Sequence, residues 1–204
     1  GIFELTEKDG TRYQFRSDHR LDYVEDLNGN RITLTYNTSS QLTVIHHSNG
    51  DSFTLQYNPQ GWISLLTDQT GEVTQYGYDT SGEHLLTVTA PGSRVTAYAY
   101  NAALEQAGDH ALLSVTDPDG RHQYFAYDML GRLSEEHLDG DAERTTYTYD
   151  PMSRITVTDA DGATAVLSPD EYGRPARGED ALGQDLSIQY DANFNLVSLT
   201  DPAG

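Results

Sequence analysis

The sequence predicts an all-β fold built from tandem β-hairpins, and three observations carry this prediction. Turn glycines recur at a nearly constant spacing, apolar and polar residues alternate between the turns, and Tyr-Asp or Tyr-Asn pairs follow most of the glycines. Repeats of this length are supersecondary units that bury their surfaces against their neighbours. We therefore expect hairpin units of about 21 residues that form a curled antiparallel ribbon, a segment of a β-shell.

The turn glycines define the repeat. They are Gly10, Gly29, Gly50, Gly71, Gly92, Gly120, Gly140, Gly162, Gly183 and Gly204. Their separations are 19, 21, 21, 21, 28, 20, 22, 21 and 21 residues, so five of nine are identical. Unrelated loops would not keep this register, and the chain is expected to be a single array of about nine units over residues 1–204. The long separation places an insertion within residues 101–113, which is interpreted as a tolerated surface insertion in preference to a contact loop.

Between the turns, side chains alternate with the period of two that half-buried strands require. The clearest strands are Ile32–Tyr36, Phe53–Tyr57, Thr74–Tyr78, Thr96–Tyr100 and Leu186–Tyr190. Return runs such as Ile63–Leu65 and Ile155–Val157 alternate as well. Only Ala102–Ala107 has the composition of a helical turn.

Three kinds of anchor recur in each unit: a tyrosine, an acidic or amide residue after it, and a Gly-Arg pair that opens the return strand. The anchors are Tyr36, Tyr57, Tyr78, Tyr100, Tyr127, Asp128, Gly131, Arg132, Tyr149, Asp150, Tyr190 and Asp191. Glycine supplies the positive φ of the turn, and Asp or Asn can bind the turn amides as in an Asx turn. We expect each tyrosine ring to face inward and stack on the ring of the next unit, forming a ladder.

Composition excludes several functions. The chain has 32 acidic and 12 basic residues and a formal charge of −20. It would repel a phosphate backbone or an anionic membrane surface, so nucleic acid is not an expected partner. No apolar run approaches the roughly 18 residues of a membrane span, so no membrane insertion is expected. The chain has no cysteine, which removes disulfides and thiolate metal sites.

Motifs for metal binding and catalysis are not found in the sequence. The seven histidines form no ligand pair of the His-Glu-x-x-His kind. Paired aspartates stand at turns, as in Asp117–Asp119 and Asp159–Asp161, but an EF-hand needs further acids that these turns lack. Asx-capped turns explain them better than weak calcium binding. Neighbouring carboxylates such as Glu135 and Glu136 diverge on a strand, so we expect no enzyme activity, no cofactor and no metal.

Aromatic side chains are the remaining candidates for ligand contact. Trp62 and Tyr124 could stack on sugar rings, because a partly wet sheet face rich in Tyr, Thr and Gln suits a carbohydrate. The period of the tyrosines favours packing over such a platform. The alternative function is thus a carbohydrate-binding or cell-surface adhesion module that recognises glycans or receptors.

The segment Tyr127-Asp-Met-Leu-Gly-Arg-Leu133, with Asp117–Gly120 before it and Tyr147–Asp150 after it, resembles the YD repeat of bacterial Rhs proteins. Related repeats occur in toxin-complex shell subunits and in teneurins, and the similarity extends over the whole chain. The resemblance implies a β-ribbon that spirals into a hollow shell enclosing a C-terminal toxin or effector. It also implies a secreted or cell-surface bacterial scaffold, whose partners are the remaining repeats and the effector of the same polypeptide.

The chain opens inside a repeat and stops on the turn Asp201–Gly204, which suggests an excised segment. The end strands of such a segment would have unpaired backbone groups. We expect edge-to-edge self-association, or curling that hides them.

Overall fold

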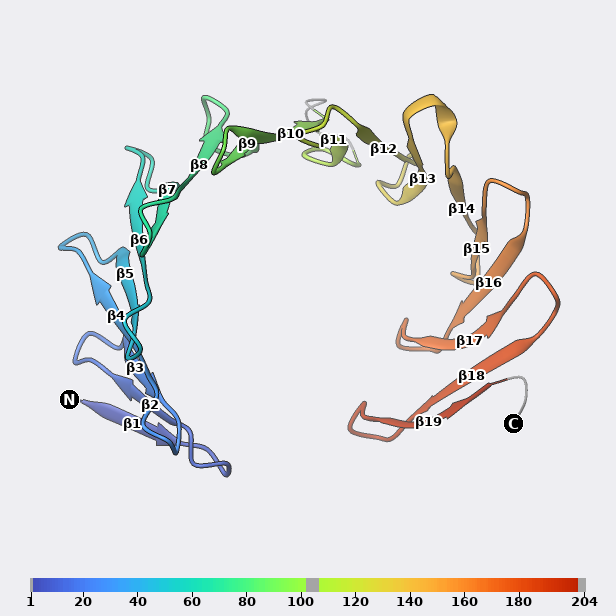
Figure 1. Ribbon diagram of the computed structural model, residues 1–204. Coiled ribbons are helices and arrows are strands. Elements are labelled where there is room, and N and C mark those ends of the chain that lie inside the picture. Colours follow the sequence, from blue (N-terminus) through green and yellow to red (C-terminus); the bar gives the residue numbers. More distant parts are fainter. Residues whose placement is uncertain (1, 102–106, 202–204) are drawn as a thin grey trace. The chain divides into compact units, whose positions relative to one another are not determined.

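A computed structural model describes residues 2–101 and 107–201, which form 19 β-strands and one 3₁₀ turn (Figure 1). The chain divides into two compact units, residues 1–97 and 98–204. The strands of the first unit are β1 (Phe3–Thr6), β2 (Arg12–Phe15), β3 (Leu21–Glu25), β4 (Arg31–Tyr36), β5 (Leu42–His47), β6 (Ser52–Tyr57), β7 (Ile63–Asp68), β8 (Val73–Tyr78) and β9 (Leu85–Ala90). Strand β10 (Arg94–Tyr100) begins in the first unit and ends in the second.

The second unit continues the same pattern. It contains β11 (Leu112–Thr116), β12 (His122–Tyr127), β13 (Leu133–Leu138), η1 (Asp139–Asp141), β14 (Thr145–Tyr149), β15 (Ile155–Thr158), β16 (Thr164–Pro169), β17 (Pro175–Glu179), β18 (Asp185–Tyr190) and β19 (Leu196–Thr200). Within each unit a strand pairs antiparallel with the strand that follows it, as β4 does with β5 and β14 with β15. The predicted all-β array of tandem hairpins is therefore confirmed.

Most hairpin turns share one hydrogen-bond pattern. In 14 turns of the described residues, the first residue donates its N–H to the carbonyl of the fifth, and the fourth donates to the carbonyl of the first. At Asp128 these distances are 2.8 Å to Arg132 and 2.9 Å from Gly131. Gly131 has φ 76°, the left-handed conformation that closes a three-residue hairpin loop. The Asp128 Oδ1 atom accepts from the N–H of Leu130 at 2.8 Å and of Arg132 at 3.0 Å, which confirms the predicted Asx cap.

A β-bulge recurs in most repeats, at the strand end that carries the anchor residue. In β12 and β13, Ala126 opposes Glu135 but Tyr127 opposes Leu133, so Ser134 is the extra residue. Shifts also lie between the pairs Gln14/Phe15, Thr35/Tyr36, Gln56/Tyr57, Gly77/Tyr78, Ser168/Pro169 and Gln189/Tyr190. Only the β14–β15 pair of the corresponding described hairpins stays in register, with Tyr149 opposite Ile155. Bulges bend a strand and increase its twist, so each bulged hairpin is locally curved. The alternation of apolar and polar residues does not predict this curvature.

Within each of the two units, the described strands form a single layer. Leu55, at 8% exposure, is the only described apolar side chain that is nearly buried, and most others are half-exposed. The one nearly buried charged residue is Glu25, which pairs with Arg12 on β2 and with Arg31 on β4. A chain with 36% hydrophobic residues therefore folds by contacts within the sheet. Among the described residues, no helix is long and apolar enough to span a membrane.

The described end of the insertion packs against a repeat turn. Asn101 receives a backbone hydrogen bond from His110 and donates its own N–H to Ala111 at 2.8 Å. Gly108 lies so close to Gly131 that a Cβ atom on Gly131 would stand 2.7 Å from the Gly108 nitrogen. From the sequence, this segment is interpreted as a tolerated surface insertion. The described part of the segment contacts the Asp128–Arg132 turn. Of the predicted helical turn Ala102–Ala107, residues 102–106 lie outside the described residues.

We predict that Gly131→Ala destabilises the protein more than Gly162→Ala. Both glycines have positive φ, 76° and 82°, so alanine strains either turn by about 1–2 kcal/mol. Only the Gly131 methyl group would also meet the backbone of Gly108, whereas Gly162 faces open space. Urea unfolding followed by circular dichroism measures both variants, and equal midpoints would contradict the contact between the insertion and the turn.

Candidate functional site

The repeated site is a hydrogen bond from the tyrosine hydroxyl of one unit to a backbone carbonyl on the preceding strand. The hydroxyl donates to the first residue of that strand at 2.7–2.9 Å. The pairs are Tyr36 with Leu21, Tyr57 with Leu42, Tyr78 with Ile63, Tyr127 with Leu112, and Tyr149 with Leu133. We call this bond the tyrosine lock.

The tyrosine lock connects successive hairpins. Tyr57 ends β6 and opposes Ile63 of β7, while its hydroxyl reaches Leu42 of β5. Leu42 itself opposes Tyr36, the anchor of the preceding unit. The Tyr57 side chain thereby connects three strands, and its hydroxyl satisfies the backbone carbonyl of Leu42 at the start of β5. Burial raises the pKa of the phenols of Tyr36, Tyr78, Tyr100 and Tyr127, as expected for rings packed against the sheet.

The rings of these tyrosines contact the residue that opens the preceding return strand. The Arg132 guanidinium lies 4.1 Å from the centre of the Tyr149 ring, and Arg174 lies 4.3 Å from that of Tyr190. In the first unit, Trp62 stacks on Tyr78 with ring centres 6.2 Å apart. This differs from the predicted stacking of tyrosine on tyrosine. Anchors of successive units are two strands apart, about 9.6 Å, which is too far for ring-on-ring contact.

The arginines that stack on these rings also form ion pairs with the aspartates of their own turns. Arg132 pairs with Asp128 at 2.7 Å, and Arg174 pairs with Asp170 at 2.6 Å. At Asp191 the amide of Asn195 takes the place of arginine, at 3.0 Å from Oδ2. The anchor residues Asp128, Gly131 and Arg132 therefore act together. They close one turn, and Arg132 also contacts the Tyr149 ring of the next repeat.

The hairpin of β16 and β17 departs from this pattern. Pro169 stands where the anchor tyrosine is expected, opposite Pro175. Arg174 of the same hairpin is surrounded by the rings of Tyr172, Tyr190 and Phe194, at 5.1, 4.3 and 4.6 Å. Its Nη1 atom is buried without a hydrogen-bond partner. These cation–π contacts join the hairpin to the following one, whereas the lock lost at Pro169 would have joined it to the preceding strand.

The two candidate ligand contacts lie in different compact units, Trp62 within residues 1–97 and Tyr124 within residues 98–204. Each ring stacks on another ring of the same compact unit. Trp62 is half-exposed (50%) and rests on Tyr78 and above Gly82. Tyr124 on β12 stacks with the imidazoles of His122 and His137, with ring centres 5.5 and 5.0 Å apart. Sequence analysis singled out Tyr124, but His137 reaches it only through the register that sets them opposite each other.

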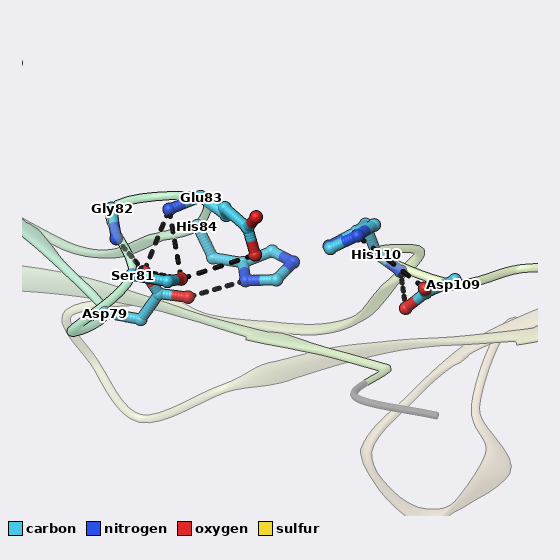
Figure 2. A network of polar contacts seen from close by, with 7 residues as sticks. All are labelled: Asp79, Ser81, Gly82, Glu83, His84, Asp109 and His110. Carbon is cyan, nitrogen blue, oxygen red and sulfur yellow. Dashed lines mark hydrogen bonds and ion pairs between the residues drawn. The ribbon is translucent and has the colours of Figure 1, made fainter. Parts of the chain in front are cut away.

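Figure 2 shows a longer turn that sequence analysis missed. The Asp79 carboxylate accepts from Gly82 N–H at 2.6 Å, from Glu83 N–H at 2.9 Å and from the Ser81 hydroxyl at 2.9 Å. Its Oδ2 atom lies 2.7 Å from His84 Nδ1. These bonds, that of His84 first, hold the pKa of Asp79 far below its usual range. The bonds converge on the backbone of the turn itself, so the cluster is a turn cap.

The same figure also includes two residues of the second unit, Asp109 and His110. The His110 N–H donates to Asp109 Oδ1 at 2.9 Å, and its Nε2 atom lies 3.7 Å from Asp109 Oδ2. His110 has φ 62°, a left-handed conformation that these local bonds help to hold. This pair belongs to the end of the insertion.

Comparison with known proteins gives a likeness of fold. No family model and no curated protein matches the sequence. A solved structure of the Photorhabdus luminescens Tc holotoxin pore, carrying a mutation in TccC3, aligns with 98% of this chain at 14% identity and a TM-score of 0.51. A crystal structure of TcdB2-TccC3 aligns with 98% at 15% identity and a TM-score of 0.50. The chain spans only 14% and 15% of the length of those chains.

These matches define the class of the protein by fold. The chain is an array of β-hairpin repeats with the fold found in Tc toxin structures, and this is the fold that the resemblance to Rhs and YD repeats implies. At 14–15% identity the likeness establishes the fold alone.

The tyrosine lock predicts a difference between two tyrosines of β8. Tyr78→Phe removes the hydroxyl that donates to Ile63, at 2.9 Å, and should cost about 1 kcal/mol. Tyr76 is a matched control, because its hydroxyl forms no hydrogen bond with the described residues and Tyr76→Phe should change stability little. Equal losses in urea unfolding would show that the lock contributes nothing specific.

A second prediction concerns pH. Hydrogen bonds from the Arg132 backbone and guanidinium lower the pKa of Asp128, so the ionised carboxylate stabilises the folded state. That contribution is present above the unfolded value of about 3.9 and is lost as pH falls through the folded pKa. Asp128→Asn keeps an Asx cap, as Asn58 does, but loses the ion pair.

We expect the variant to be less stable than the wild type at pH 7 and equally stable at strongly acidic pH. Unfolding midpoints measured across the acid range check this. A difference that stays constant with pH would contradict the role of the charge.

Proposed function

We propose that the chain is a structural segment in the wall of a hollow β-shell, and that this shell encloses a C-terminal toxin or effector of the same polypeptide. The observation that carries the proposal is a single-layer sheet whose hairpins are joined by the tyrosine lock, with no core of its own. Such a sheet is extended by adding hairpins, because each strand needs only its two neighbours. The likeness of fold to Tc toxin structures supports this proposal.

The partners in this proposal are the neighbouring repeats and the enclosed domain, in a secreted or cell-surface protein. The high negative charge supports a wall that stays hydrated and does not bind nucleic acid. The segment itself performs no catalysis in this proposal. Its carboxylates with lowered pKa, such as Asp79 and Asp128, are bound to their own turns, which supports a structural role.

Limited proteolysis of the whole polypeptide that carries this segment tests the proposal. The domain after the repeats should resist a protease that cuts it rapidly when it is produced alone. Replacing Tyr57 and Tyr78 by alanine removes two tyrosine locks and two rings from the wall, so the enclosed domain should be cut faster.

The matched control is the double change to phenylalanine, which keeps both rings in the wall and should leave most of the protection. If the downstream domain is cut equally fast in the wild-type polypeptide and in isolation, the segment does not enclose it.

A further inference from the structure

One edge of the second unit carries a row of exposed apolar side chains. In a hairpin array, alternate turns lie at the same edge, so the turns β12–β13, β14–β15, β16–β17 and β18–β19 share one edge. The residues at these turns are 57–95% exposed: Met129, Leu130, Met152, Tyr172 and Phe194. We call this row the apolar edge. Exposed apolar rows on a charged protein mark interaction surfaces.

Closing these turns does not require Met129, Leu130 or Met152, whereas Tyr172 and Phe194 also contact Arg174. The corresponding turns of the first unit at Arg16 and Asn37 have the same hydrogen bonds but polar tips, Ser17-Asp18 and Thr38-Ser39. Both kinds of tip project from a turn that is already closed by its own backbone and Asx bonds. Met129, Leu130 and Met152 therefore add nothing to the closure of their turns, and their placement in successive hairpins serves contact outside the turns.

The charges of the second unit show what can approach this edge. Each aspartate that opens one of its first three turns pairs with an arginine: Asp128 with Arg132, Asp150 with Arg154, and Asp170 with Arg174, at 2.6–2.7 Å. The opposite edge carries the aspartates 117, 119, 139, 141, 159, 161 and 180, and among the described residues only Asp119 of these pairs with an arginine. A second molecule with a charge of −20 is therefore repelled at the opposite edge and repelled least at the apolar edge.

We propose that the apolar edge binds the apolar edge of a second copy of this chain. Successive tips are two strands apart, about 9.6 Å, and only a partner with the same period can place its tips between them along the whole row. A two-fold arrangement supplies that partner, because it sets the same patch on both copies. Tyr172 and Phe194 already touch, with ring centres 5.3 Å apart, so neighbouring turns present a continuous strip. Five side chains cover less than the roughly 800 Å² per partner of a standard interface, so the dimer is weak.

Sedimentation equilibrium of this chain over a range of concentrations tests the proposal. The wild type should change from monomer to dimer mass as concentration rises. The double variant Leu130→Ser and Met152→Ser should stay monomeric, since both side chains are exposed and their loss leaves the turns closed. The matched control, Leu27→Ser with Leu182→Ser, removes two exposed leucines from the β3–β4 turn of the first unit and the β17–β18 turn of the second, and should dimerise like the wild type.

A cross-linking measurement identifies the edge directly, because the chain has no cysteine of its own. A bis-maleimide should link copies of the Met152→Cys variant and not copies of Leu182→Cys. A wild type that is monomeric at every concentration overturns the proposal. Dimers that persist in the Leu130→Ser and Met152→Ser variant also overturn it, because association then runs through end strands or another face.

Discussion

A one-layer sheet has nothing on either face to cover its side chains, and this constraint determines the other features of the structure. Where a domain with two layers buries leucines between them, this chain leaves nearly all apolar residues half-exposed. Burial must come from neighbours within the sheet. The tyrosine is suited to that position, because its ring covers the adjacent strand and its hydroxyl satisfies a carbonyl that water would otherwise have to reach.

Because each hairpin depends on the next, contacts that join neighbours matter more than those inside one hairpin. The Arg132 side chain illustrates this: it binds Asp128 of its own turn and covers Tyr149 of the following unit. In the hairpin that has Pro169 in place of the tyrosine, Arg174 contacts three rings and joins this hairpin to the following one. Stability in such an array is close to a sum over neighbours, so a local substitution of this kind can be tolerated.

The sequence predicted the features that depend on order along the chain. The spacing of the glycines and the alternation in runs such as Phe53–Tyr57 located the strands, and Asp before the turn glycines predicted the caps. Features that depend on register between strands were not predicted. The bulge at Ser134 and the stack of His137 on Tyr124 depend on the register within one hairpin, and the reach of Tyr57 to Leu42 depends on the register between two hairpins. Period alone suggested stacked tyrosines, but distance across two strands rules that contact out.

The repeat also separates residues that the fold requires from those it leaves free. The first residue of a turn must accept amide hydrogens, the fourth must adopt a left-handed conformation, and the residue before the turn must contact the preceding strand. The two tip residues have none of these duties, which is why Thr38-Ser39 and Met129-Leu130 occupy the same turn geometry. Any preference shown at the tips over several successive hairpins therefore reflects the surroundings of the ribbon. The tips Met129, Leu130 and Met152, with the arginine-paired aspartates of their turns, are such a preference, because closure of the turns alone would accept serine and threonine there.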